Sequence, residues 1–149
     1  MKISYSLMSF EDVDGVHKIS QESFSLPWTR DAIQNEVFNL NSQYIIAKND
    51  FTNEVIGFVG VWIIAGEASI INIAVDKKYR NLGVGTSLLN HLFRLCKDMN
   101  CHDITLEVRE SNILAQSMYS KMGFIEEGRR KGFYDCPKED CIIMWNRNF

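Results

Sequence analysis

Three strand-like runs joined by very short links constrain the fold of this chain most strongly. They are YIIAK (44–48), VIGFVGVWII (55–64) and SIINIAV (69–75), and the links between them are rich in turn-forming residues. A parallel crossover connection needs about a dozen residues or more. Links this short therefore predict an antiparallel meander in the middle of the chain.

The segment after this meander changes the expected topology. Leu88, Leu92 and Cys96 belong to a wide apolar stripe that is typical of a buried helix face, and DITLEVR (103–109) alternates apolar and polar residues as a strand does. A strand, a helix and a second strand in succession predict a parallel neighbour pair. We therefore expect a mixed α/β fold, a mostly antiparallel sheet with a central parallel pair flanked by helices, and one domain over residues 1–149.

The two ends of the chain are expected to add elements of the same kind. Residues 2–8 are expected to form a first strand, and Ser9 and Asp12 have the S-x-x-D spacing of a helix entrance. Thr29 is suited to cap a second short helix. The final segments, FIEEGRRKGFY and DCIIMWNRNF, are expected to form two closing strands.

One more helix is expected before these closing strands. Ser111 or Asn112 can cap it. Apolar residues at helical spacing predict its core face: Leu114, Met118 and Met122. This assignment leaves Tyr119 on another face of the helix, and Gly123 is suited to end it.

Composition and charge argue against several classes of protein. The net charge is −3 and the pI is near 5.6, so no global attraction to nucleic acid is expected. The basic run 129–131 is expected to be a solvated strand edge. The N-terminus lacks the apolar block of a signal peptide, and no run of about 18 apolar residues could span a membrane. We expect a cytoplasmic protein without a membrane partner, and the sequence is compatible with a monomer.

The four cysteines form two C-x4-C pairs, Cys96/Cys101 and Cys136/Cys141. Zinc-binding knuckles typically use C-x2-C spacing, so no metal site is expected. Free thiols are expected in a reducing compartment. Cys96 in particular fits the helix stripe as a small core side chain.

A glycine loop, RNLGVG (80–85), lies where the long helix should begin. Unpaired N–H groups at a helix N-terminus form a natural site for phosphate, although the two glycines alone also fit a plain helix start. The loop of NTPases needs Gly-Lys-Ser/Thr, whereas Thr86 follows Gly85 here. The dinucleotide fingerprint needs a third glycine where this chain has Leu88.

The wider segments NIAVDKKYRNLGVGTSLL and LEVRESNILAQSMYSKMGF closely resemble the GNAT acetyltransferases. With LPW near residue 27, the chain is similar to the bacterial branch that modifies the N-terminal alanine of a ribosomal protein. The resemblance implies acetyl-CoA as cosubstrate and the N-terminal segment of a small-subunit ribosomal protein as partner. Asn81 and Leu82 stand where polar or basic residues are common in the family.

The resemblance also implies where acetyl-CoA would bind. The main chain of one strand segment would pair with the pantetheine amides, and the glycine loop would hold the pyrophosphate through backbone N–H groups. Asn112 would also contact CoA. The residues implied for the strand segment and the loop are Ile73, Ala74, Val75, Asn81, Leu82, Gly83, Val84, Gly85 and Thr86.

Four further residues are implied for catalysis and for the acceptor. Glu107 would be the general base and Tyr119 the general acid, while Trp28 and Tyr134 would line the acceptor groove. Asn112 and Tyr119 are seven residues apart, so they face the same side of a helix. Simpler roles stay open for three of these residues: Glu107 as a solvated strand residue, and Tyr119 and Trp28 as core side chains.

The chemistry of amines separates the expected substrates. An α-amino group has a pKa of about 7.7–8.0 and a lysine of about 10.4, so deprotonating lysine at neutral pH costs roughly 3–4 kcal/mol more. An N-terminal amine is therefore the easier acceptor. Two alternatives remain at this point: acetylation of a small-molecule amine, and a CoA-binding module without catalysis.

Overall fold

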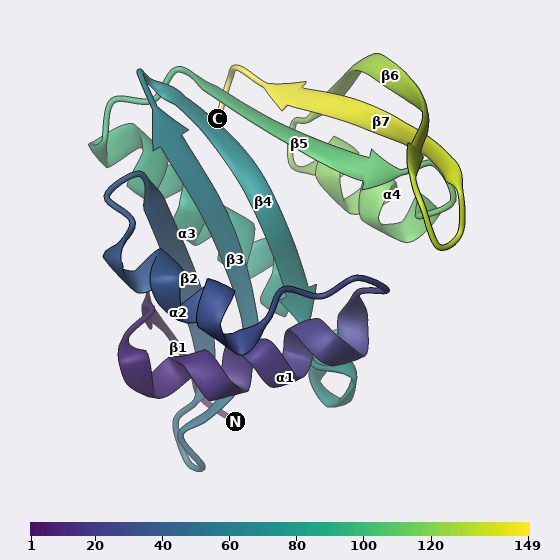
Figure 1. The fold of residues 1–149 in the computed structure, drawn as a ribbon. Coiled ribbons are helices and arrows are strands. Elements are labelled where there is room, and N and C mark those ends of the chain that lie inside the picture. The colour runs from purple at the N-terminus through teal and green to yellow at the C-terminus, as the bar shows by residue number, and fades with distance from the viewer.

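Seven strands form one sheet in the order β1-β2-β3-β4-β5-β7-β6 in the computed structural model, which describes residues 1–149 (Figure 1). The strands are β1 (Ile3–Leu7), β2 (Ser42–Asn49), β3 (Glu54–Ile64), β4 (Glu67–Val75), β5 (Asp103–Arg109), β6 (Ile125–Tyr134) and β7 (Glu139–Asn146). The helices are α1 (Val13–Ser23), α2 (Arg30–Phe38), α3 (Val84–Asp98) and α4 (Ile113–Lys121), with short 3-10 turns at Phe10–Asp12 and Lys77–Tyr79.

The predicted fold class is confirmed. Strands β1 to β4 pair antiparallel in chain order, β4 and β5 form the single parallel pair, and β5, β7 and β6 pair antiparallel. The predicted helix between β4 and β5 is α3. Strand β6 ends the sheet, and Arg129 and Lys131 on it are exposed, as expected for a solvated edge.

The parallel pair is short, and the sheet divides there. Strand β4 pairs with β5 only over Glu67–Ser69 opposite Asp103–Thr105, although β4 continues to Val75. A bulge lies just beyond the last pair, because Gly60 and Val61 of β3 face Asn72 and Ile70 and leave Ile71 without a partner. Beyond Ser69 the two strands separate, and the sheet opens as a wedge (Figure 1).

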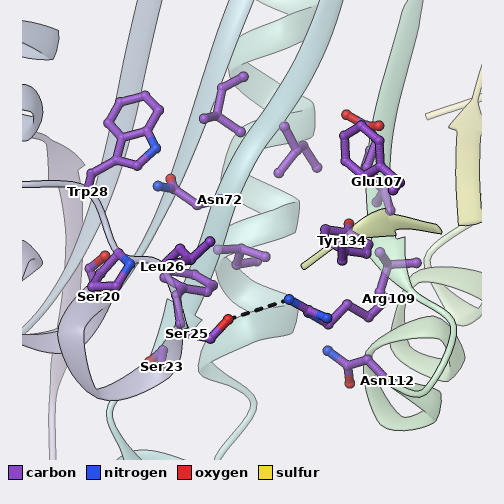
Figure 2. A pocket seen from close by; sticks show the side chains of 18 of the residues that line it. Ser20, Ser23, Ser25, Leu26, Trp28, Asn72, Glu107, Arg109, Asn112 and Tyr134 are labelled. Atoms are coloured by element: carbon purple, nitrogen blue, oxygen red, sulfur yellow. Dashed lines mark hydrogen bonds between the residues drawn. The ribbon is translucent and has the colours of Figure 1, made fainter. Parts of the chain in front are cut away.

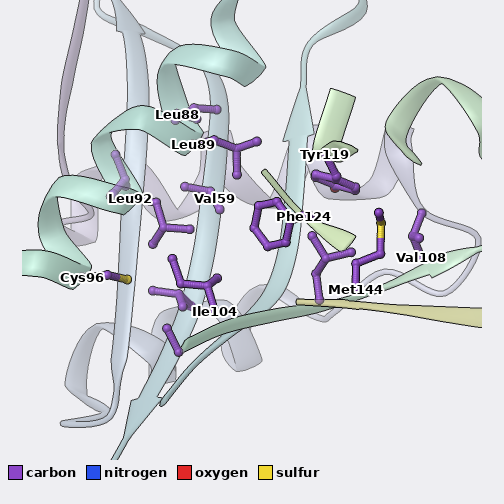
Figure 3. Close-up of a cluster of buried hydrophobic side chains, with 14 of the residues drawn as sticks. Val59, Leu88, Leu89, Leu92, Cys96, Ile104, Val108, Tyr119, Phe124 and Met144 are labelled. Carbon is purple, nitrogen blue, oxygen red and sulfur yellow. The ribbon is translucent and has the colours of Figure 1, made fainter. Parts of the chain in front are cut away.

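Helices cover both faces of the sheet. The larger core lies under α3 and α4, where Leu88, Leu92 and Cys96 are fully buried in one cluster with Tyr119 and Phe124 (Figure 3). The smaller core lies under α1 and α2 and includes side chains from both helices and from β2 to β4. The apolar periodicity of α3 therefore predicts its buried face correctly.

Helix α4 is packed differently from the prediction. Leu114 is 86 % exposed, so it does not belong to the core, while Tyr119 is only 5 % exposed and packs within it. Met118 and Met122 are partly buried against the same core. The helix carries apolar side chains around most of its circumference, and its spacing alone does not select the buried face.

The predicted helix ends are confirmed by their hydrogen bonds. The Oγ1 atom of Thr29 accepts from the Ala32 N–H at 3.1 Å, and the Oδ1 atom of Asn112 accepts from Ala115 N–H at 3.3 Å. Gly123, at φ +101°, follows α4 in a conformation that side-chain-bearing residues rarely adopt. Asn112, rather than Ser111, is therefore the cap of α4.

One buried ion pair fastens the first helical segment to the sheet. Lys48 Nζ of β2 lies 2.6 Å from Asp12 Oδ1, and the Asp12 side chain is only 3 % exposed. The other carboxylate oxygen accepts hydrogen bonds from the N–H and the hydroxyl of Ser9, at 2.9 and 3.2 Å. The S-x-x-D spacing thus does form the predicted helix entrance.

Replacing Lys48 by Met is expected to lower the free energy of unfolding by about 3–5 kcal/mol, because it leaves the buried Asp12 carboxylate unpaired. Urea denaturation of the variant and the wild type measures the loss. The matched control is Asp14→Ala, which removes an exposed ion pair with Arg30 and should cost about 1 kcal/mol or less. Equal losses in the two variants would contradict this role of Asp12.

All four cysteines are free thiols, and Cys96 is fully buried in the larger core, as predicted. None of the helices has both the length and the apolar character needed to cross a bilayer.

Candidate active site

The wedge between β4 and β5 contains a cavity of about 480 Å³ (Figure 2). One wall is the end of α1 and the loop to α2, from Ser20 to Trp28. The floor is β4 from Ile70 to Ile73, and the other wall is formed by β5, α4 and the end of β6. Both walls and the floor carry residues that the sequence predicts for the site.

The floor of the cavity is a strand with one free edge. From Ile70 onward β4 pairs with β3 on one side only, because pairing with β5 ends at Ser69. Ile73 lines the cavity, and Ala74 and Val75 follow it along the same strand. An unpaired strand edge can form main-chain hydrogen bonds with an extended molecule that carries amide groups.

The glycine loop presents a set of free backbone donors at the start of α3. None of the N–H groups from Asn81 to Thr86 donates to another group of the chain. Gly83 is the N-cap at φ +78°, a left-handed conformation that favours glycine, and Asn81 has φ +62°. The buried Val84 anchors the loop, whereas Leu82 is 57 % exposed. Free N–H groups and the helix dipole together favour an anion here.

Gly85 lies where α3 approaches α4. A Cβ atom at this position would stand 3.2 Å from the Sδ atom of Met118, which is a tight contact. Gly83 differs, because an added Cβ would meet nothing within 4 Å and only its positive φ resists substitution. Gly83 therefore shapes the turn, and Gly85 permits the close approach of the two helices.

The carboxylate of Glu107 lies on the cavity wall with its two oxygens in different surroundings. Oε2 lies 3.8 Å from Arg130 Nε and accepts a weak hydrogen bond from Cys141 Sγ at 3.6 Å. Oε1 has no partner within the chain, and the side chain is 43 % exposed. The contacts orient the carboxylate through Oε2 and leave Oε1 available to accept a proton.

Tyr119 lies on the same wall with its ring in the core. It packs edge-on against Phe124 with ring centroids 5.8 Å apart, and its hydroxyl makes no hydrogen bond within the chain. Burial raises the pKa of Tyr119 to about 12, so the phenol is protonated at neutral pH. Asn112, at the cap of the same helix, also lines the cavity, as its seven-residue spacing from Tyr119 predicts.

Trp28 and Tyr134 stand on opposite walls (Figure 2). Trp28 packs near Trp62, with ring centroids 6.4 Å apart. The Tyr134 ring lies under the Arg109 guanidinium, 4.4 Å from its Cζ atom, and burial raises the pKa of this tyrosine. Two aromatic side chains thus flank the space in front of Glu107.

Three further residues of the cavity were not singled out from the sequence: Ser25, Asn72 and Arg109. Asn72 was detectable in principle, since it is the only polar residue of IINIAV in β4. Its Oδ1 atom is buried without a hydrogen-bond partner. Ser25 and Arg109 are 84 positions apart, and no sequence signal brings them together.

The sheet that opens between β4 and β5 and the free N–H groups at the start of α3 together suit a phosphate-bearing ligand with an amide-containing arm. The sequence matches the acetyltransferase (GNAT) family over residues 13–124, and the chain belongs to that family. The resemblance seen in the sequence is therefore confirmed.

Within the family, two of the similar curated proteins are named for the same activity. A candidate ribosomal protein bS18-alanine N-acetyltransferase of Bacillus subtilis is 37 % identical, and the match covers 93 % of this chain and 91 % of that protein. The Haemophilus influenzae ribosomal protein bS18-alanine N-acetyltransferase is 32 % identical, with 89 % and 90 % covered.

Solved structures agree with this placement. The Escherichia coli ribosomal-protein-S18-alanine N-acetyltransferase has a TM-score of 0.90 at 26 % identity, covering 97 % of this chain and 93 % of that one. Arabidopsis thaliana NAA60 in complex with acetyl-CoA has a TM-score of 0.88 at 20 % identity, with 97 % of each chain covered, and shares the fold.

No group of three or more His, Cys, Asp or Glu side chains is arranged to hold a metal ion.

Proposed function

We propose that this protein transfers the acetyl group of acetyl-CoA to the N-terminal α-amino group of a protein. The proposed acceptor is the N-terminal alanine of a small-subunit ribosomal protein such as bS18, on which the similar curated proteins are named to act. Glu107 is the proposed base and Tyr119 the proposed acid.

The observation that carries the proposal is the run of free N–H groups from Asn81 to Thr86 at the N-terminus of α3. Such donors suit the pyrophosphate of CoA. The free edge of β4 leads from this loop to the cavity, so Ile73, Ala74 and Val75 can pair with the amides of the pantetheine arm. Asn112 is proposed to contact the same arm.

The proposed reaction is a direct transfer. The amine nitrogen attacks the thioester carbonyl carbon, a C–N bond forms, and the C–S bond breaks. Glu107 Oε1 accepts the proton that the amine loses, directly or through a water. Tyr119 donates its phenolic proton to the departing thiolate. A main-chain N–H of the Ile73–Val75 segment is suited to donate to the carbonyl oxygen as negative charge develops.

The charge of the cavity supports a peptide acceptor over a small polyamine. The lining carries two carboxylates, Glu107 and Asp135, and one cation, Arg109. A small polycation would be held better by several acidic groups at close quarters. The aromatic side chains Trp28 and Tyr134 instead provide apolar walls for the first residues of a peptide.

A panel of acceptors tests the proposal. The purified protein is incubated with acetyl-CoA and peptides that begin with Ala, the same peptides with a blocked N-terminus and an internal lysine, and free polyamines or aminoglycosides. We expect acetylation of the free N-terminal peptides only, because their amine is deprotonated more easily than lysine and the cavity has no cluster of acidic groups to hold a polycation. Preference for free polyamines or aminoglycosides would overturn the proposed acceptor. Acetyl-CoA binding without any transfer would favour a non-catalytic module.

A further inference from the structure

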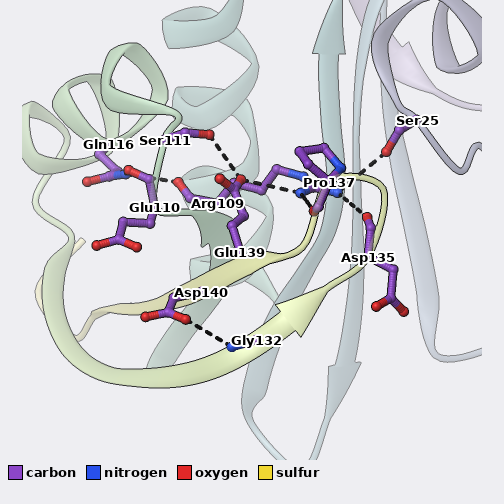
Figure 4. A network of polar contacts seen from close by, with 10 residues as sticks. All are labelled: Ser25, Arg109, Glu110, Ser111, Gln116, Gly132, Asp135, Pro137, Glu139 and Asp140. Carbon is purple, nitrogen blue, oxygen red and sulfur yellow. Dashed lines mark hydrogen bonds and ion pairs between the residues drawn. The ribbon is translucent and has the colours of Figure 1, made fainter.

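Arg109 holds the hairpin between β6 and β7 through several contacts at once (Figure 4). Its Nη1 donates to the Pro137 carbonyl at 2.8 Å and lies 3.3 Å from Glu139 Oε1, and its Nη2 donates to the Asp135 carbonyl at 3.0 Å. The guanidinium also covers the ring of Tyr134. A planar group with five donors suits this set of acceptors, whereas a lysine could not satisfy them together.

The main chain at Arg109 and the carboxylate that faces its guanidinium are also held by hydrogen bonds. The Arg109 carbonyl accepts a hydrogen bond from Gln116 Nε2 of α4 at 2.9 Å. Ser111 Oγ donates to Glu139 Oε1 at 3.0 Å, which holds the carboxylate that faces Arg109. The position of the guanidinium is therefore set from β5, α4 and β7 together.

One contact of Arg109 crosses the cavity. Nη2 donates to Ser25 Oγ, in the loop between α1 and α2, at 3.4 Å. In Figure 2 this contact lies between Trp28, Asn72 and Glu107 above and Ser23 and Asn112 below. It is the longest hydrogen bond of this guanidinium, so Arg109 holds the α1–α2 loop more weakly than it holds the hairpin.

We propose that Arg109 is a positioning residue that sets the acceptor entrance by fastening the hairpin firmly and the α1–α2 loop weakly. The hairpin carries Tyr134, and the loop leads to Trp28, so the width between these two aromatic side chains depends on Arg109. This inference rests on the proposed function, because it assigns the acceptor to that side of the cavity. Holding both walls in place before the acceptor arrives lowers the ordering cost of binding.

The test compares the KM for the acceptor peptide with the KM for acetyl-CoA. For Arg109→Met we expect the acceptor KM to rise about 10-fold or more and the acetyl-CoA KM to stay within about twofold. Ser25→Ala, which removes only the contact across the cavity, is expected to raise the acceptor KM about threefold. Arg109→Lys should fall between these two variants.

The matched control is Arg129→Met on the outer strand β6. Arg129 pairs with Glu110 and Asp140 and does not line the cavity, so its loss should leave both KM values within about twofold. An acceptor KM that stays at the wild-type value in Arg109→Met and Ser25→Ala would overturn the inference. An equal rise in both KM values would do so too, since it would indicate a general structural role.

Hydrogen exchange of the uncomplexed protein separates this inference from the proposed function. Faster exchange at residues 24–28 and 134–138 in Arg109→Met, but only at 24–28 in Ser25→Ala, is the expected result. Unchanged exchange at both segments would overturn the inference. If the wild type acetylates no amine, the proposed function fails, and exchange alone then decides whether Arg109 links the two walls.

Discussion

Replacing Tyr119 by Phe is expected to lower kcat by about 10²–10⁴-fold, the usual contribution of a general acid, while acetyl-CoA affinity stays nearly unchanged. The Tyr119 hydroxyl makes no hydrogen bond within the chain, so its removal leaves no buried partner unsatisfied. The ring and its contact with Phe124 are retained. Steady-state kinetics together with calorimetric titration of acetyl-CoA measures the two quantities separately.

The pH dependence follows from the environment of this tyrosine. Burial raises the pKa of Tyr119 to about 12, so the folded protein keeps the phenol protonated as pH rises, and the proton is lost only near that value. An α-amino group loses its proton near pH 8. The kcat/KM for a peptide should therefore rise up to about pH 8 and then stay level to about pH 10.

Two outcomes would remove Tyr119 from the mechanism. One is a kcat of Tyr119→Phe that equals the wild-type value. The other is a fall of kcat/KM between about pH 8 and 10 that persists unchanged in the Phe variant, because the proton that turnover needs would then belong to another group.

Replacing Gly85 by Asp is expected to weaken binding of CoA by on the order of 100-fold. A carboxylate at the start of α3 stands close to the free N–H groups of the loop, where the pyrophosphate of CoA is proposed to bind. The carboxylate and the pyrophosphate are both negative, and such charges a few ångström apart repel by about 3 kcal/mol in partly exposed surroundings. The new side chain must also displace Met118, since its Cβ would lie 3.2 Å from Sδ. Calorimetric titration with CoA measures the loss.

The control for this variant is Gly85→Asn, which has the same shape without the charge. The difference in CoA affinity between the two variants measures the charge repulsion alone, because both side chains crowd Met118 equally. This difference should shrink as the salt concentration is raised. Pantetheine, which lacks the pyrophosphate, should bind both variants alike. If Gly85→Asp binds CoA as tightly as the wild type does, the loop is not the pyrophosphate site.

Local patterns were enough to predict most of the fold. The short links before β3 and β4 enforce antiparallel pairing, and the long passage through α3 enforces the parallel pair. Leu114 shows the limit of this reasoning, because α4 is short and apolar on several sides, so only its position against β5 and β7 decides that Tyr119 is buried.

The geometry of the candidate site was predictable where its residues lie within one local motif. The turn at Gly83 and the alternation that exposes Glu107 are both visible in the sequence. The opening of the sheet after Ser69 depends on competing strand pairings, and the contact of Arg109 with Ser25 joins segments 84 positions apart. Neither leaves a periodic signal in the chain.

The free edge of β4 has a consequence for aggregation. Unpaired strand edges on a surface recruit strands from other molecules and lead to aggregation. From Ile70 onward this edge borders the cavity between the α1–α2 loop and the hairpin, so it is not an outer edge of the sheet. The α1–α2 loop and the hairpin thus flank the unpaired strand edge, and the strand itself carries no proline or lysine that would protect it.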